Sequence, residues 1–218
     1  LNDAMTLTHE AGHSMHSYMS CKNQPYQYSH YPIFLAEVAS TFHEELLLQH
    51  LLAKVESKEQ KAYLINQKID DIRATFFRQT MFAEFELKIH ELVEQDVPLT
   101  PAMLKQLYRD LNLKYFGDHM KVDEEIDIEW ARIPHFYYNF YVYQYATGLS
   151  ASCALAERVL SGEKGAKEQY LTFLSSGSSK FPLDTLADAG VDMRSSKPVE
   201  ALIAKFNMLV AELQVLLA

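Results

Sequence analysis

Apolar residues recur at helical spacing along most of the chain. Ile65, Ile69, Ile72 and Phe76, for example, follow one another at intervals of three or four residues, which places them on one face of a helix. No alternating run of apolar and polar residues is long enough to predict a strand. Glycine and proline number only seven each, so few positions interrupt helices. The pattern predicts an all-α fold.

Residues that favour helix starts and ends divide this pattern into separate helices. Ser57 and Gln60 form a capping box, and Thr100 before Pro101 is typical of a helix start. The main expected helices cover residues 2–21, 33–55, 57–94, 101–115 and 134–160, and they are followed by a shorter helix after 162 and a helical pair that ends in an amphipathic helix after 198. The acidic segment 122–129 is expected to be an irregular connection, whereas Pro134 is expected to begin one continuous helix.

Composition and charge narrow the class of protein. A chain of 218 residues with 48% hydrophobic content can bury a large core, so we expect one domain over residues 1–218. The net charge is −9 and basic residues do not cluster, so neither nucleic acid nor an anionic membrane surface is an expected partner. No apolar stretch approaches the roughly 20 residues of a membrane span, and no signal peptide is recognisable. The oligomeric state is not indicated.

The number and spacing of the cysteines indicate the cellular compartment. The chain has two cysteines, Cys21 and Cys153, without a CxxC pair or regular spacing. This argues against a disulfide framework and suits a reducing compartment, so we expect a soluble, cytoplasmic protein.

The candidate chemistry begins with the HExxH motif His9-Glu10-Ala11-Gly12-His13 on the first predicted helix. Residues four apart differ by only about 40° around a helix, so both imidazoles reach one point beside it. Glu10 lies about 100° from His9, too far round to be an easy ligand, yet close enough to contact a water held by the metal. The motif predicts one Zn²⁺ per chain, bound by His9 and His13, with Glu10 as the general base that activates the zinc-bound water.

A third ligand is needed because a catalytic zinc has three protein ligands and one open position. Glu37 lies among apolar neighbours near the start of the 33–55 helix, where an isolated carboxylate is costly unless it meets a cation. We therefore expect Glu37 to be the third ligand. Glu44, two turns later on the same face, is the competitor, with an orienting role towards a ligand histidine at most. His16 is expected to be a hydrogen-bonded wall residue.

Four stretches resemble the catalytic region of the oligoendopeptidase F family, which belongs with the thimet-type zinc oligopeptidases. They are LTHEAGHSMHSY, FLAEVASTFHEE, HFYYNFYVYQYATG and FPLDTLADAGVDM. The resemblance implies a cytoplasmic zinc endopeptidase for oligopeptides, with a mostly helical catalytic domain and a site in a deep channel between two lobes. By motif position it assigns the zinc ligands to His9, His13 and Glu37 and the general base to Glu10. Members are much longer ahead of HExxH, so the chain is expected to be a C-terminal fragment.

Five tyrosines lie between His135 and Tyr145. On one continuous helix, Tyr138, Tyr141 and Tyr145 share a face beside His135. Such a run is often an aromatic core stripe, but a metallopeptidase also needs donors for the oxyanion of its tetrahedral intermediate, and thimet-type enzymes are similar in carrying a histidine and tyrosines downstream of their zinc ligands. We therefore expect His135 and Tyr145 to stabilise the transition state and Tyr138 and Tyr141 to contact substrate.

Alternatives to the leading hypothesis remain open at this point. The chain would be a catalytically silent helical fragment or binding lobe if the upstream half of the cleft is required for turnover. A zinc peptidase that trims peptide ends would need a pocket for a free terminus, which no residue identifies. Gly148 and the loop 175–179 could each bring the backbone close to a peptide substrate. The alternative for the loop is a flexible connector.

Overall fold

The structure, a computed structural model, describes residues 1–218, and every regular element in it is helical. The all-α fold predicted from the periodicity is therefore confirmed. The chain divides into two compact units. Unit 1 comprises Leu1–Ile72 and Thr147–Ala218, and unit 2 comprises Arg73–Ala146. No helix combines the length and the hydropathy that a membrane span requires.

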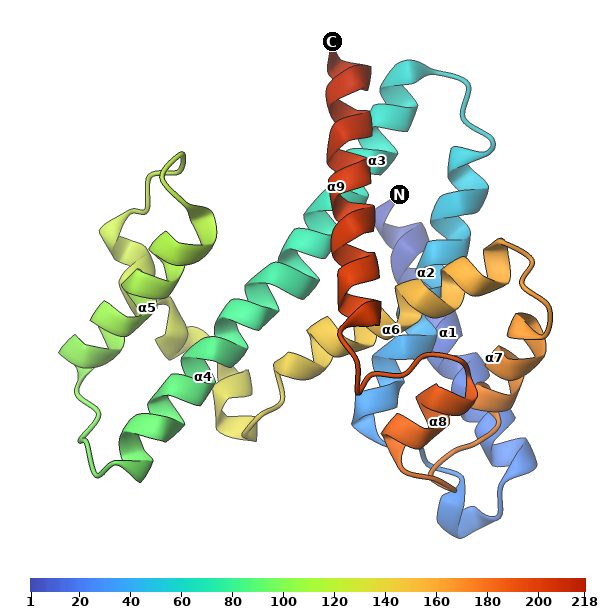
Figure 1. Ribbon diagram of the computed structural model, residues 1–218, viewed down its shortest axis with the longest axis horizontal. Helices are drawn as coiled ribbons and strands as arrows, with labels where there is room; N and C mark the ends of the chain where they lie inside the picture. Colours follow the sequence, from blue (N-terminus) through green and yellow to red (C-terminus); the bar gives the residue numbers. More distant parts are fainter. The chain divides into compact units, whose positions relative to one another are not determined.

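Unit 1 contains a short 3-10 turn and the larger part of the helices. Its elements are α1 (Asn2–Asn23), η1 (Tyr26–Tyr28), α2 (Ile33–Leu52), α3 (Lys58–Ile72), α6 from Thr147 onward (Tyr143–Leu160 in full), α7 (Ala166–Leu174), α8 (Pro182–Asp188) and α9 (Lys197–Leu217). Helix α1 packs against α2, and α9, drawn in red, runs along α3 (Figure 1).

The core of unit 1 is built around α2, which carries apolar residues on most of its circumference and is therefore buried on several sides. Its buried members from α2 are Leu35, Val38, Ala39 and Phe42, and they meet residues of α6, α7 and α8. A fully buried carboxylate, Glu45, is neutralised there by Lys68 and Lys205. This anchoring fixes α2 and, with it, the side chains that α2 presents to α1.

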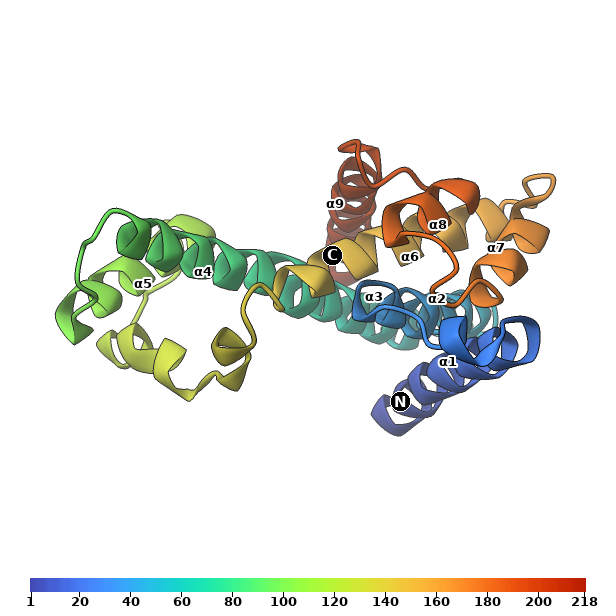
Figure 2. The same cartoon turned by 90° about the horizontal axis from the view of Figure 1, so that it is seen from below.

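Unit 2 is smaller and has its own core. Its elements are a π-helical turn η2 (Arg73–Phe77), α4 (Arg78–Glu94), α5 (Pro101–Phe116), the 3-10 segments η3 (Glu124–Arg132) and η4 (Pro134–Tyr138), and the first residues of α6. Helices α4 and α5 lie side by side (Figure 2). The core of unit 2 is rich in aromatic side chains. Its buried members are Met81, Phe82, Phe85, Tyr108, Leu111, Ile133 and Val142.

Two of the predicted helix starts are confirmed in detail. The Ser57 hydroxyl accepts a 3.3 Å hydrogen bond from the Gln60 N–H, and the Thr100 hydroxyl accepts one of 3.3 Å from the Met103 N–H. The helix expected over 57–94 is wrong as a single α-helix, because the π-helical turn at 73–77 separates α3 from α4.

The acidic segment was expected to be irregular, and this is wrong: most of it forms η3. The physical reason is a tertiary contact. Glu129 is buried and accepts hydrogen bonds from the Tyr108 hydroxyl at 2.7 Å and from the guanidinium groups of Arg78 and Arg132. A charged partner from α4 and a hydroxyl donor from α5 thus order a segment whose local charge pattern predicts a loop.

The helix expected over 134–160 is also wrong as a continuous element. A short 3-10 segment ends at Tyr138, Asn139 and Phe140 have positive φ angles of 29° and 58°, and α6 begins only at Tyr143. The break is held by α4, because the Phe140 N–H donates to the carboxylate of Glu86.

Candidate metal centre

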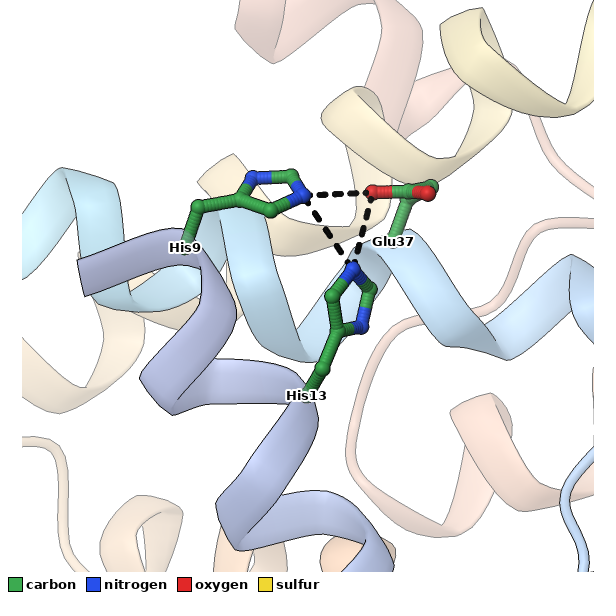
Figure 3. A group of neighbouring side chains, drawn as sticks. All are labelled: His9, His13 and Glu37. Atoms are coloured by element: carbon green, nitrogen blue, oxygen red, sulfur yellow. Dashed lines mark hydrogen bonds and ion pairs between the residues drawn. The ribbon is translucent and has the colours of Figure 1, made fainter. Parts of the chain in front are cut away.

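Three side chains from two helices of unit 1 converge on one point. His9 and His13 project from α1, and Glu37 projects from α2 towards both imidazoles (Figure 3). The Nε2 atoms of His9 and His13 are 3.1 Å apart, and Glu37 Oε2 lies 3.3 Å from the first and 3.7 Å from the second. Ligands at about 2.0–2.1 Å from a tetrahedral zinc are roughly 3.3 Å from one another. The three atoms therefore already have the spacing that a zinc ion requires.

The close approach of α1 to α2 depends on Gly12, which is buried between the two histidines. A Cβ atom at this position would lie 2.6 Å from the Ser40 Cα and 2.9 Å from the Ala39 carbonyl oxygen. Contacts this short are not tolerated, so only glycine lets the helix backbones touch here. On the other side of the site Gly148 of α6 lies over Glu37, with its hypothetical Cβ 3.4 Å from the Glu37 Cβ.

Hydrogen bonds orient the candidate ligands. The His9 Nδ1–H donates to Glu44 Oε1 at 2.6 Å, which leaves Nε2 directed at His13 and Glu37. The Ser40 hydroxyl donates to Glu37 Oε2 at 2.9 Å. A carboxylate behind a ligand histidine fixes the ring and increases its basicity. The structure thus puts Glu44 where an orienting residue is expected and puts Glu37 beside the two imidazoles.

The charges of the site favour a bound cation. Hydrogen bonds that His9 donates to Glu37 and then to Glu44 raise the pKa of His9 to about 10. The hydrogen bond from His9 also lowers the pKa of Glu37. Two carboxylates beside two imidazoles therefore attract positive charge. A proton on His9 supplies one unit of that charge in the metal-free chain, and a divalent ion would supply two units after displacing the proton.

Glu10 is exposed on α1 between the two histidines. Its backbone carbonyl accepts a 2.9 Å hydrogen bond from the Ser14 hydroxyl, whereas its carboxylate has no hydrogen-bond partner in the protein. The carboxylate is thus available to water or to a substrate.

His16 differs from its expected role. Its ring is fully buried and stacks on Tyr31, with centroids 3.6 Å apart and planes within 3°, and it also contacts Phe173. Neither ring nitrogen has a hydrogen-bond partner, so the expected hydrogen bond is wrong. Burial lowers the pKa of His16 to about 3. His16 therefore packs α1 against Tyr31 and Phe173 as a neutral aromatic ring.

The predicted tyrosine group forms a cluster within unit 2. The His135 ring stacks on Tyr141 at 5.5 Å and meets the edge of Tyr145 at 6.1 Å, and the Tyr145 hydroxyl lies 3.5 Å from His135 Nε2. Tyr138 joins through Tyr141 at 6.2 Å. The structure therefore brings these four residues together, although by a chain reversal rather than along the continuous helix that predicted their common face.

The serine-rich loop at 175–179 is fixed against the segment after α1. Gly177 has φ 52°, and a Cβ there would lie 2.0 Å from the Tyr28 carbonyl oxygen. That oxygen accepts a 3.0 Å hydrogen bond from the Ser178 N–H, and the Gln24 amide donates to the Ser175 carbonyl at 2.9 Å. The hypothesis of a flexible connector is therefore wrong, and the glycine serves a close backbone approach within unit 1.

Comparisons with known proteins agree with this picture. The model of peptidase family M3 matches residues 1–205. The chain is 52% identical over 217 residues to oligopeptidase PepF of Bacillus subtilis, covering 100% of this chain and 32% of that protein. It is 48% identical over 214 residues to the chromosomal oligoendopeptidase F of Lactococcus lactis subsp. cremoris, covering 98% and 36%. The chain thus spans about a third of the length of these curated relatives.

Two solved structures are also similar. The crystal structure of oligoendopeptidase-F from Enterococcus faecium aligns with a TM-score of 0.89 at 43% identity, covering 100% of this chain and 39% of that one. A putative peptidase from Chlamydophila abortus aligns with a TM-score of 0.92 at 46% identity, covering 99% and 36%.

Proposed function

This chain belongs to peptidase family M3, as its resemblance to the oligoendopeptidase F group predicted, and from this premise we propose that it carries the catalytic centre of a zinc-dependent endopeptidase acting on oligopeptides. The observation that carries the proposal is the convergence of two imidazole nitrogens and one carboxylate oxygen, all within 4.8 Å of one another. The proposed location is the cytoplasm, which suits the free thiols of Cys21 and Cys153.

The donor set fits zinc. Two neutral histidines with one carboxylate are a common protein ligand set for catalytic zinc and leave a fourth position open. His9, His13 and Glu37 would hold the ion, and Glu44 would keep the His9 ring in the ligating tautomer. When bound, Zn²⁺ would lower the pKa of a water molecule to about 7 and polarise the scissile carbonyl.

Glu10 is the proposed general base. Its carboxylate accepts a proton from the attacking water while the new C–O bond forms at the peptide carbonyl carbon. It then gives that proton to the leaving nitrogen as the C–N bond breaks, so the base is regenerated. The support is its position in the sequence between the two histidines and its free, exposed carboxylate.

His135 and Tyr145 are proposed to donate hydrogen bonds to the oxyanion that develops on the carbonyl oxygen. Tyr138 and Tyr141 are proposed to contact the peptide. The support is chemical. The His135 imidazole and the Tyr145 phenol, both of which carry groups that can donate, lie 3.5 Å apart within unit 2. Tyr138 is 63% exposed, which leaves its ring available to a ligand.

The proposed function is tested with the protein that contains this chain and with internally quenched peptides whose two ends are blocked. Cleavage that stops with a chelator and returns with stoichiometric zinc is the expected result. If only peptides with a free terminus are cleaved, the protein trims ends and the endopeptidase assignment is wrong. Activity that survives complete metal removal contradicts the zinc mechanism.

A further inference from the structure

The segment that joins η4 to α6 has a strained backbone. Asn139 and Phe140 have consecutive positive φ angles of 29° and 58°, and neither is glycine. L-residues rarely adopt this region, and two in a row persist only when surrounding contacts hold them. The turn therefore needs a partner that compensates for its conformation.

That partner is Glu86 on α4. The Phe140 N–H donates a 2.7 Å hydrogen bond to Glu86 Oε1, and this is the one polar contact of a side chain that is 2% exposed. Removing a carboxylate from water is costly unless it is compensated. The buried carboxylate of Glu45 on α2, by comparison, has two lysines. Glu86 has a backbone N–H of the strained turn instead.

A second contact from α4 holds the same residue. The His90 ring, one helical turn beyond Glu86, lies 4.6 Å from the Phe140 ring at 33°. One face of α4 thus binds both the main chain and the side chain of Phe140.

The turn determines the geometry of the histidine and tyrosine cluster. On an uninterrupted α-helix, residues six apart are separated by about 9 Å along the axis and roughly 120° around it, so His135 and Tyr141 would not meet. Across the turn their rings stack at 5.5 Å. The chain reversal also brings the Tyr145 hydroxyl to 3.5 Å from His135 Nε2.

We propose that Glu86 is a positioning residue for the peptidase reaction: by accepting the Phe140 N–H it stabilises the strained turn, and the turn holds His135 against Tyr141 and Tyr145. The inference rests on the proposed function for the role of His135 and Tyr145. The stabilisation of the turn by Glu86 does not depend on that function, and it can be measured in a protein that has no activity.

The test compares Glu86→Leu with Glu86→Gln in the protein that contains this chain. Leucine removes the acceptor at similar volume, whereas the glutamine amide oxygen can still accept the N–H. For Glu86→Leu we expect kcat to fall about 10- to 100-fold, with zinc content unchanged because the ligands belong to unit 1, and amide hydrogen exchange across 139–142 to rise at least about tenfold. Glu86→Gln should remain within about threefold of the parent in both measurements.

Two further variants separate positioning from general stability. Glu84→Leu is the matched control, because Glu84 lies on the same helix but pairs with Lys114 and Tyr115 of α5; exchange at 139–142 should not change in it. Asn139→Gly removes the side chain that makes a positive φ costly. Added to Glu86→Leu, it should restore a large part of kcat if the turn is what Glu86 holds.

Three results would overturn the inference. These are unchanged exchange at 139–142 in Glu86→Leu, an equal loss in the leucine and glutamine variants, and no recovery with Asn139→Gly. An inactive parent protein refutes the proposed function instead, and the exchange measurements identify that case, because they report on the turn alone.

Discussion

The His9 imidazole donates a 2.6 Å hydrogen bond from Nδ1 to the Glu44 carboxylate. This pair joins α1 to α2 and fixes which ring nitrogen faces Glu37. It also places a second negative charge beside the candidate metal centre. The orientation and the charge both bear on how the site binds a cation.

Replacing Glu44 by Gln is expected to weaken zinc binding about 10- to 100-fold, because the amide holds the His9 ring less firmly and its oxygen makes the nitrogen less basic. Competition with a chromogenic chelator measures the affinity. Glu212→Gln is the control, since Glu212 pairs with Lys61 on the surface of unit 1. Equal zinc affinity in Glu44→Gln and the parent would show that Glu44 does not support the site.

Zinc binding should release a proton from His9. In the metal-free chain the neighbouring carboxylates raise the pKa of His9 to about 10, so the ring is protonated at pH 7 and must lose that proton to ligate. The ion pairs of His9 with Glu37 and Glu44 therefore contribute fully to the stability of the metal-free fold when the pH is below 6.5, the ordinary pKa of histidine. This contribution is lost as the pH rises through about 10.

Apparent zinc affinity should therefore increase close to tenfold per pH unit between about pH 7 and 9. Titration calorimetry in buffers of different ionisation enthalpy should report about one proton released per zinc at pH 7.5. Affinity that is independent of pH over this range would contradict the account of His9.

Gly12→Ala should destabilise the fold and the metal site together. In an exposed helix this change stabilises by about 1 kcal/mol, but here the new Cβ would lie 2.6 Å from the Ser40 Cα. We expect a loss of roughly 1–3 kcal/mol in the free energy of unfolding, measured with urea, and weaker zinc binding. Gly148→Ala is the matched helical control, because its Cβ would meet Glu37 Cβ at a tolerable 3.4 Å. If Gly12→Ala is as stable as Gly148→Ala, the helices do not need this contact.

His16→Phe should remove a pH dependence of stability. Burial lowers the folded pKa of His16 to about 3 from 6.5, so the native ring is neutral. Its contribution to the free energy of unfolding is therefore fully present above pH 6.5 and is lost as the pH falls towards 3. The slope reaches about 1.4 kcal/mol per pH unit from this one group.

Urea unfolding of the metal-free protein at several pH values tests this slope. The parent should lose stability on acidification faster than His16→Phe, and at pH 7.5 the variant should be at least as stable, because the two imidazole nitrogens have no partner to lose. Parallel pH profiles for the two proteins would mean that His16 is hydrated or paired in solution.

Sequence reasoning was sufficient where local spacing carries the information. The interval of four between His9 and His13 predicts their convergence on a helix, and the apolar surroundings of Glu37 indicate a carboxylate with a cationic partner. Both expectations depend on residues within a turn or two of one another, and the structure brings the three side chains together.

The features that the sequence could not predict arise from tertiary contacts. The motif assigns no chemical role to Gly12, and the small residues Ala39 and Ser40 on the facing helix are the signal in the sequence for a close crossing. The turn at Asn139 and Phe140 depends on Glu86, 54 positions earlier in the chain. Local helix propensity through Tyr145 gave no sign of it, because the compensating hydrogen bond comes from another helix.

The central claim is that Glu10 activates water beside an ion held by His9, His13 and Glu37. The most direct measurement is kcat of Glu10→Gln relative to the parent protein at equal, independently measured zinc occupancy. We predict full zinc occupancy with kcat reduced about 10²- to 10⁴-fold, since the base is lost and the ligands are not. A Glu10→Gln protein that holds its zinc and cleaves blocked peptides at the parental rate would contradict the mechanism.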